Sequence, residues 1–509
     1  MANKRVASIK SITAPIGGLN ARDGISEMSE KDAVVMKNMF PTPTDVRIRS
    51  GMTAHLTGIS GLVETIIPYS SGTTHKIFAA AGDKIYDATT AGVAGSAAVS
   101  SMTNARWQYI NMGTAGGNYM LAVNGSDKMR IYTGSAWDYD GGGTYTVTGV
   151  NTANCIHINN FKNRVWFIEK NKLSAWYLPV SSIAGAAAEL NLNSIFKLGG
   201  YLVAMANWTI DNTSGIDDYA AFITSEGECA IYQGTDPTSS TTWSLKGTFR
   251  VGKPIGRRCF IKAGADVILL STDGAFPLSK SLLTDRTQKQ AAITDKITNL
   301  ISGDIKAYKD NFGWQAIIYP FGNKLILNVP SAEGVTSHQY VMNMISGAWT
   351  EFGGWNAFCF EESDDSLYYG GDGTVYKCDT GTDDNGSNIE ADCQQSYSYF
   401  NQKGVIKRFL QARPIFLSDG DIYPSIRMNV DYELEDTISP PSFSGTSGSE
   451  WDVSDWDVSD WGGNDSIFKN WQSISGVGYA GGIRIRTSTT GISYRWQSTD
   501  ISFESGGMF

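Results

Sequence analysis

The residues that most often catalyse reactions or bind metals are few in this sequence, and their spacing matches no familiar site. The closest of the six cysteines, Cys378 and Cys393, are 15 positions apart, so no CxxC spacing for zinc or redox chemistry exists. The four histidines form no HxH, HxxxH or HExxH pair; they are His55, His75, His157 and His338. A nucleophile elbow, a P-loop and a dinucleotide fingerprint are all missing. We therefore expect buried free thiols, no metal centre, no cofactor and no enzyme activity.

One segment comes close to a calcium-binding loop. Within residues 381–392, Asp383, Asn385, Gly386 and Asp392 fall at loop positions 3, 5, 6 and 12. Position 1 should be an acid and is Gly381, so one ligand is missing. We expect a solvated interdomain turn here, with calcium binding as the alternative. A pair of catalytic carboxylates for glycoside hydrolysis would also suit a β-rich protein, but the sequence singles out no such pair.

The most unusual group is a tandem aromatic and acidic repeat, WDVSD at 451–455 and again at 456–460. Ten acids and no Lys or Arg lie between Met428 and Phe468. We single out a candidate lumen or tip loop made of Trp451, Asp452, Asp455, Trp456, Asp457, Asp460 and Trp461. In this hypothesis the carboxylates repel a passing polyanion and the tryptophans anchor the loop on neighbouring subunits. The alternative is a solvated acidic loop whose tryptophans stack locally.

The composition restricts the class of protein. Charged residues make up 18% of the 509 positions, glycine occurs 55 times, and the net charge is −10. An acidic chain lacks the basic surface that tight binding to a phosphate backbone needs. No apolar run approaches the 18 or so residues of a spanning helix, and no apolar stretch follows the N-terminus. We expect a soluble protein without a signal peptide, made in a reducing cytoplasm.

A recurring unit of strand, tight turn and strand organises most of the chain. The turns centre on positions 82, 125, 171, 227, 274, 323 and 373, at intervals of 43 to 56 residues. Such a period predicts a β-propeller, because a lone blade cannot bury both its faces whereas blades packed around an axis bury one another. We predict about seven blades over residues 55–385, although six or eight would fit the same turns. Unrelated hairpins in sandwiches are the alternative.

The regions outside this period have their own signals. A helix is expected over residues 287–301, with Ile293, Ile297, Leu300 and Ile301 packing on the outside of a blade. From residue 386 to 509, longer alternating strands predict a β-sandwich or barrel, and Ile483 to Arg486 should bury one face and leave the other wet or paired. The expected organisation is an N-terminal arm or clasp (1–54), a propeller platform (55–385) and a β-rich tube domain (386–509).

Several short motifs resemble those of one family. Residues 17–23 (GGLNARD), 33–41 and 46–51 (VRIRSG) resemble the opening of the tail hub, or nozzle, proteins of short-tailed bacteriophages. Residues 271–278 (STDGAFPL), the expected helix and the Trp-Asp repeat also resemble features of that group. These motifs are short and structural, and the likeness extends over most of the chain in order and architecture.

The resemblance implies a structural virion protein with no catalytic residues. It implies a closed homohexameric ring in the tail, assembled in the host bacterial cytoplasm, that docks below the portal on the adaptor, or head-to-tail connector. Such a ring conducts double-stranded DNA during genome ejection without binding it specifically, and it can carry tail fibres or tailspikes. The alternatives are a propeller enzyme or a carbohydrate-binding tail module acting on host surface polysaccharide.

Overall fold

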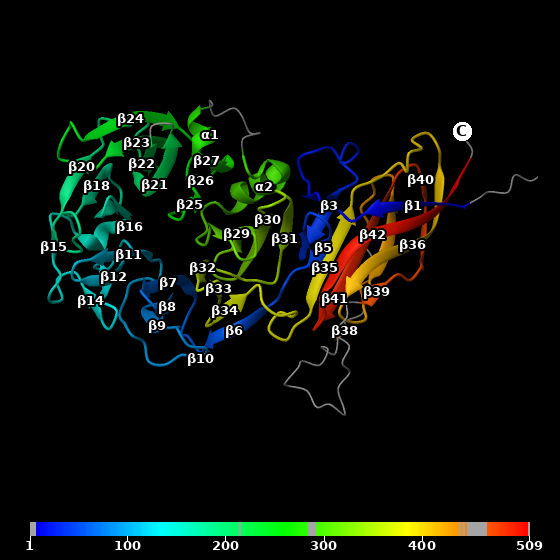
Figure 1. Ribbon diagram of the computed structural model, residues 1–509, viewed down its shortest axis with the longest axis horizontal. Coiled ribbons are helices and arrows are strands. Elements are labelled where there is room, and N and C mark those ends of the chain that lie inside the picture. Colours follow the sequence, from blue (N-terminus) through cyan, green and yellow to red (C-terminus); the bar gives the residue numbers. More distant parts are fainter. Residues whose placement is uncertain are drawn as a thin grey trace, which may run out of the picture.

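The computed structural model describes residues 7–212, 215–283, 292–436, 439–440, 443–444 and 466–506. It is an all-β protein in which a ring of small sheets stands beside a β-sandwich (Figure 1). The expected fold class, a β-propeller followed by a β-sandwich, is confirmed. In the described part of the chain, no helix has the length and apolar character needed to cross a membrane.

Over the described residues the ring consists of seven blades, and the first four are separate antiparallel sheets. Blade one holds β7 (Val63–Ser71), β8 (Thr74–Ala81) and β9 (Lys84–Asp87). Blade two holds β11 (Gln108–Thr114), β12 (Gly117–Val123), β13 (Arg130–Tyr132) and β14 (Trp137–Tyr139). Blade three holds β16 (Cys155–Phe161), β17 (Arg164–Glu169), β18 (Ser174–Tyr177) and β20 (Ala188–Asn191). Blade four holds β21 (Leu202–Asn212), β22 (Gly215–Thr224), β23 (Glu228–Gly234) and β24 (Trp243–Arg250).

The remaining three blades complete the circle. Blade five holds β25 (Phe260–Ala263), β26 (Asp266–Ser271) and β27 (Gly274–Pro277), followed by helix α1 (Leu278–Leu283). Blade six holds β28 (Gln315–Tyr319), β29 (Lys324–Ala332), β30 (Thr336–Asn343) and β31 (Trp349–Phe352). Blade seven holds β32 (Cys359–Ser363), β33 (Ser366–Gly370), β34 (Val375–Cys378) and, from the N-terminal chain, β6 (Met52–Thr57).

The turn chemistry explains the periodic signal. All seven turn positions have a positive φ: Gly82, Gly125, Asn171, Gly227, Gly274, Asn323 and Gly373. Glycine and asparagine tolerate this conformation, which tight hairpins require. Six of the turns join the second and third strands of a blade, whereas Asn323 joins the first and second strands of blade six. That difference explains part of the unevenness of the interval.

The ring is held together by hydrophobic cores between successive blades. Seven buried clusters occur in the described residues, and six of them each join one blade only to the next. The cluster between blades three and four, for example, stacks Trp166 on Trp243 at 5.6 Å between ring centroids. The ring closes where β6 pairs with β34, and Leu56 of β6 is 3% exposed in the core between blades seven and one. The expected clasp is therefore strand β6.

The first sheet of the sandwich runs in the order β39 (Ser466–Phe468), β36 (Lys407–Ser418), β42 (Tyr494–Ser505), β5 (Val46–Ile48), β4 (Met39–Pro41). Strand β1 (Ala7–Thr13) also pairs with β42, and β40 (Gln472–Gly478) pairs with β36. The second sheet contains β3 (Asp32–Lys37), β35 (Ile389–Gln395), β41 (Gly481–Thr490) and β37 (Ser425–Val430), with β2 (Gly18–Leu19) and β38 (Phe443–Ser444) at its margins. As expected, Ile483 and Ile485 are buried while Arg484 pairs with Asp392.

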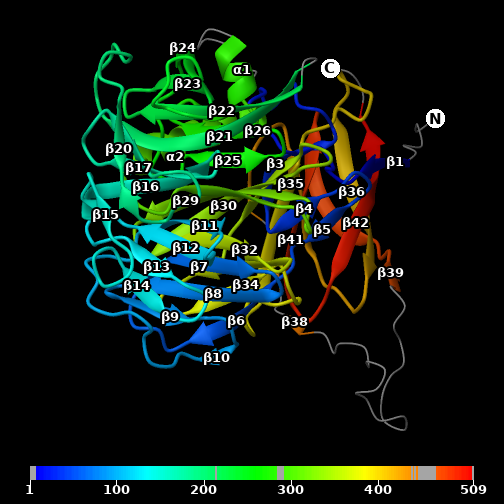
Figure 2. The ribbon, with the colours of Figure 1, turned by 60° about the vertical axis from the view of Figure 1, so that its left-hand side comes forward.

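The propeller and the sandwich share one sheet. The order β28-β29-β30-β31-β3-β35-β41-β37 runs from blade six into the sandwich, and the step from β31 to β3 is one parallel pair, Lys37 with Glu351. The seventh hydrophobic cluster is also shared, since it extends from Ile261 of blade five through Trp349 of blade six to Trp496 of the sandwich. Residues 7–48, expected to be an extended arm, are built into the sandwich as β1 to β5, and the expected boundary after residue 54 falls inside β6. Figure 2 shows the two parts lying against each other.

The helical segment differs in detail from the expectation. A short 3-10 turn (Asp295–Ile297) leads into helix α2 (Thr298–Tyr308), while residues 287–291 lie outside the described chain. The buried face repeats every fourth residue through Ile297, Ile301 and Ile305, so Leu300 is 37% exposed and not part of the core. The helix lies on blade six, where Asp304 accepts a hydrogen bond from the Tyr340 hydroxyl at 2.7 Å.

Arg49 occupies the junction of the two parts with its side chain fully buried. Its Nε donates to Asn38 Oδ1 at 2.9 Å, and its terminal nitrogens donate to the Ser50 and Gly353 carbonyls. Both terminal nitrogens also bind the Asp384 carboxylate, at 2.8 and 2.5 Å. The guanidinium lies 5.0 Å from the centroid of the Trp355 ring. All five N–H donors are thus satisfied, and they join the N-terminal chain to the loops that leave blades six and seven.

We expect Arg49→Met to destabilise the protein by about 3–5 kcal/mol, because it leaves the Asp384 carboxylate buried without its partner. Arg47 offers a matched control two positions away, since its side chain is 46% exposed and pairs with Asp45. Arg47→Met should cost less than about 1 kcal/mol. Urea unfolding of the three proteins measures both effects, and equal losses would show that the junction contributes no special stability.

Candidate functional site

The sequence-based candidate loop lies outside the described residues. Trp451, Asp452, Asp455, Trp456, Asp457, Asp460 and Trp461 all belong to the segment 445–465. The strands on either side of it are β38 and β39, and each belongs to one sheet of the sandwich. The segment therefore leaves from and returns to the sandwich, not the propeller.

The segment with calcium-loop spacing does not form such a loop. Asp383 accepts a hydrogen bond from the Gly386 amide, and Asn385 accepts one from the Ala54 amide. Asp392 lies on β35, where it binds Arg484 at 2.7 Å. No group of three or more His, Cys, Asp or Glu among the described residues is placed to hold a metal ion. Residues 385–387 are an exposed turn that joins blade seven to the sandwich.

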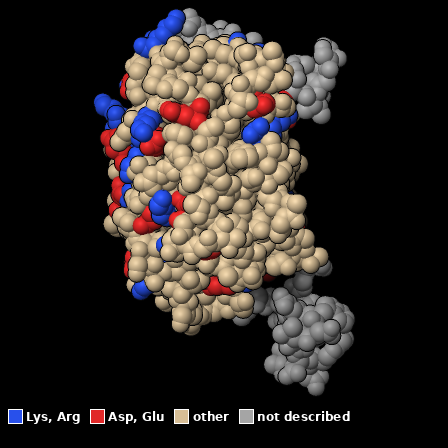
Figure 3. Space-filling view, turned by 90° about the vertical axis from the view of Figure 1, so that its left-hand side faces the viewer, with Lys and Arg blue, Asp and Glu red and all other residues tan. Residues whose placement is uncertain are grey.

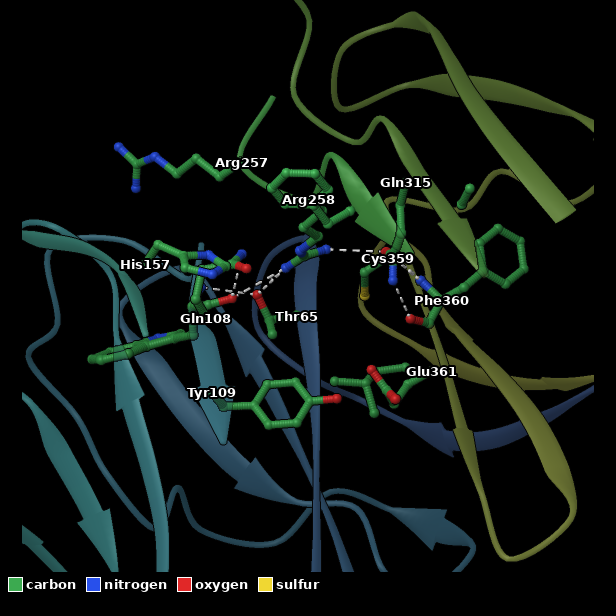
Figure 4. Close-up of a pocket in the computed structure, with 14 residues that line it drawn as sticks. Thr65, Gln108, Tyr109, His157, Arg257, Arg258, Gln315, Cys359, Phe360 and Glu361 are labelled. Atoms are coloured by element: carbon green, nitrogen blue, oxygen red, sulfur yellow. Dashed lines mark hydrogen bonds between the residues drawn. The ribbon is translucent and has the colours of Figure 1, made fainter. Parts of the chain in front are cut away.

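A site that the sequence analysis missed lies on the propeller axis. A cavity of about 210 Å³ is lined by the first strands of six blades. Its polar lining comes from Thr65, Gln108, Tyr109, His157, Arg257, Arg258, Gln315 and Glu361 (Figure 4). Thr65, Gln108, His157, Gln315 and Glu361 each follow the start of a blade, so they recur at nearly the same period as the turns. That recurrence is the signal that could have identified them.

Arg258 joins blades across the axis (Figure 4). Its Nη2 donates to Thr65 Oγ1 at 2.8 Å and to the Glu64 carbonyl at 3.0 Å, and its Nη1 donates to Gln315 Oε1 at 3.2 Å. Gln315 in turn exchanges two hydrogen bonds with the backbone of Phe360. The network thus connects blades one, five, six and seven around a charged group that is partly buried. Such a network holds the inner strands in register.

Glu361 supplies the carboxyl group in the lining of the axial cavity. Burial raises the pKa of the Glu361 carboxyl group to about 7, although a hydrogen bond from Tyr109 opposes this shift. Figure 4 shows the Tyr109 hydroxyl pointing at this carboxyl group from the opposite side of the cavity. Burial also raises the pKa of Tyr109 well above its ordinary value, so the phenol stays neutral and can donate. Of the two groups, Glu361 is therefore the one whose charge changes near neutral pH.

His157 completes the lining as a neutral base. Burial lowers the pKa of its imidazole to about 4. Its Nε2 lies 2.9 Å from the Met205 carbonyl, which fixes Nε2 as the protonated nitrogen and leaves Nδ1 without a partner in the described structure. The cavity thus holds one carboxyl group, one neutral imidazole and two guanidinium groups. This set can bind a small polar molecule or ordered water, and it lacks the paired carboxylates of a glycosidase.

Comparisons with known proteins identify no family and give distant similarity to solved structures. No protein-family model matches the chain, and the search of curated proteins also found no match. A structure of BBS1N in complex with ARL6DN matches 65% of this chain and 96% of its own at a TM-score of 0.41 and 10% identity. The Swd1 β-propeller domain from Myceliophteria thermophila matches 64% and 98% at 0.40 and 10% identity. PorZ, from the type-IX secretion system of Porphyromonas gingivalis, matches 64% and 37% at 0.37 and 12% identity. None of the three is described as a tail protein.

The raised pKa of Glu361 predicts a specific pH dependence of stability. Its folded pKa of about 7 exceeds the ordinary 4.5, so its contribution to stability is greatest below pH 4.5 and is lost as the pH rises towards 7. Glu361→Gln removes this loss, and it should therefore stabilise the protein by roughly 1–3 kcal/mol more at pH 8 than at pH 5.

Glu390→Gln is the control, because Glu390 is exposed on β35 and lies outside the axial cavity. Denaturant unfolding of both variants at both pH values measures the difference. If the effect of Glu361→Gln changes no more between these pH values than that of Glu390→Gln, the carboxyl group is solvated and not buried in the cavity.

Proposed function

We propose that this chain is the subunit of a tail nozzle, or hub, in a short-tailed bacteriophage. The observation that carries the proposal is the sheet shared by blade six and the sandwich. Together with the fully buried Arg49, it makes the propeller and the sandwich one mechanical body. A subunit of a conduit must keep its shape while its neighbours press on it, and the pairing of β31 with β3 across the boundary, together with Arg49, supports that rigidity.

The outer surface of the propeller also supports a role in assembly. Residues 88–105, 141–154 and 173–188 contain no Asp, Glu, Lys or Arg. Figure 3, which views the left-hand side of Figure 1, shows a broad face with few charged residues, most of them gathered along one edge. A surface with few charges has little ionic hydration to lose when another protein covers it.

In this proposal several copies close into a homohexameric ring below the portal, with the adaptor as its upper partner and tail fibres or tailspikes as further partners. The sandwiches form the distal part of the conduit for double-stranded DNA. In this role the carboxylates of the Trp-Asp repeat, residues 451–461, keep the DNA from adhering during ejection. The protein resides in the virion tail and is assembled in the host cytoplasm.

Counting the chain in purified virions tests the proposal. Particles of the phage that encodes it should contain about six copies for each portal ring, as a closed cyclic assembly requires. Quantitative mass spectrometry against the portal protein gives the ratio, and electron microscopy of labelled particles locates the chain. A single copy per particle, or absence from the particle, would overturn the proposal, whereas a monomer in isolation would not.

The axial cavity favours one alternative, a propeller enzyme or carbohydrate-binding module. A buried carboxyl group with a pKa near 7 is suited to general acid catalysis on a sugar. In that case polysaccharide from the host surface should be cleaved, or should stabilise the isolated chain, and Glu361→Gln should abolish cleavage.

A further inference from the structure

A second cavity lies beside the axial one on the same end of the propeller. Its volume is about 350 Å³, and turns between blade strands line it, together with the linker from blade four to blade five. Arg257 lines both cavities. The apolar part of the lining, which we call the apolar floor, consists of Ile156, Val203, Tyr201 and Pro254. The rest of the lining includes charged side chains.

Those charges are mainly positive in a protein whose net charge is −10. The charged residues that line the cavity are Lys170, Lys253, Arg257, Lys309 and Asp310. Lys253 forms an ion pair with Glu226 at 2.6 Å. No described carboxylate lies within ion-pair distance of Lys170 or Arg257. The cavity has more positive than negative charge at its surface.

The two cations without a described carboxylate partner, Lys170 and Arg257, bind the same turn. Lys170 Nζ donates to the Gly125 carbonyl at 3.0 Å, and Arg257 Nη1 donates to the Asn124 carbonyl at 3.2 Å. These are consecutive carbonyl groups of one turn, so the two cations contact the same turn from different parts of the chain. Burial and the nearby Arg106 guanidinium lower the pKa of Arg257, which indicates a positive charge that its surroundings do not neutralise.

Arg257 is partly buried and has no described carboxylate partner, whereas Arg49 binds Asp384, Arg106 binds Glu64 and Arg484 binds Asp392. A partly buried charge without a counter-ion is costly to remove from water. Lys170 is exposed and adds a second positive charge that binds the same turn. An anion bound beside Arg257 would compensate its charge.

We propose that this cavity binds a phosphate-type oxyanion, either free phosphate or the phosphate group of a small ester. Lys170 and Arg257 hold its oxygens through charge-assisted hydrogen bonds, and Lys309 adds positive charge at the rim. The apolar floor next to Tyr201 accommodates the organic part of an ester. Asp310, the one acid in the lining, weakens binding.

Thermal unfolding with inorganic phosphate tests the site. At about 10 mM phosphate, compared with chloride at equal ionic strength, the midpoint of the wild-type protein should rise by about 2–4 °C. Lys170→Met and Arg257→Gln should each weaken phosphate binding at least about tenfold, so that the rise becomes smaller by about 1 °C or more, whereas Asp310→Asn should enlarge it. Each midpoint is compared with the same variant in chloride, which separates binding from any change in basal stability.

Lys246→Gln is the matched control, because this exposed lysine of β24 lies outside the cavity and its loss changes the net charge by the same amount. It should keep the full response to phosphate. An equal response in all variants, or no response in the wild-type protein, would overturn the proposal.

Glycerol phosphate and adenosine monophosphate then identify the source of the oxyanion. A small ester that binds more tightly than inorganic phosphate shows that the apolar floor is used, and equal or weaker binding assigns the cavity to free phosphate.

Discussion

The buried guanidinium of Arg49 is the constraint on which the arrangement of the two parts depends. A charged group with no exposed surface is tolerated only if every donor has a partner, and these partners come from three distant segments at residues 38–50, 353 and 384. Moving the sandwich relative to the propeller would remove at least one of them. The cost of leaving donors or a carboxylate unpaired therefore opposes hinge motion at this junction, and the continuous sheet opposes it from the other side.

The propeller could be predicted from local sequence patterns. Positive φ at a hairpin selects glycine or asparagine, and all seven expected turns have it, which is why the period in the sequence matches the blades in the structure. The chain gives no comparable local sign of how the N-terminal segment is used. Strand β1 pairs with β42, joining Ala7 to Glu504, and β3 joins Lys37 to Glu351 and Asp392. Pairings across such separations depend on the assembled fold, so an alternating segment could equally have been an arm.

The candidate sites also could be predicted only as far as local sequence patterns allow. The seven residues of the Trp-Asp repeat were found by composition alone, and composition fixes neither the position of a loop nor its partners. The axial residues looked like ordinary strand starts, although Gln108, Gln315 and Glu361 recur at the blade period. Their role becomes visible only when the ring brings them together, because burial of the Glu361 carboxyl group in the assembled ring is what raises its pKa to about 7. The two cavities thus differ. Polar groups of the axial cavity bind one another across the blades, whereas Lys170 and Arg257 in the second cavity have no carboxylate partner among the described residues.

Hydrogen exchange under native conditions tests most directly whether the propeller and the sandwich are one body. The amides to follow are those of β31 and β6 in the propeller and of β3 and β35 in the sandwich. If the shared sheet and Arg49 lock the two parts, these amides should open together with one free energy and one dependence on denaturant. If those of β3 and β35 open at lower denaturant while β31 and β6 stay protected, the two parts move independently and the account is contradicted.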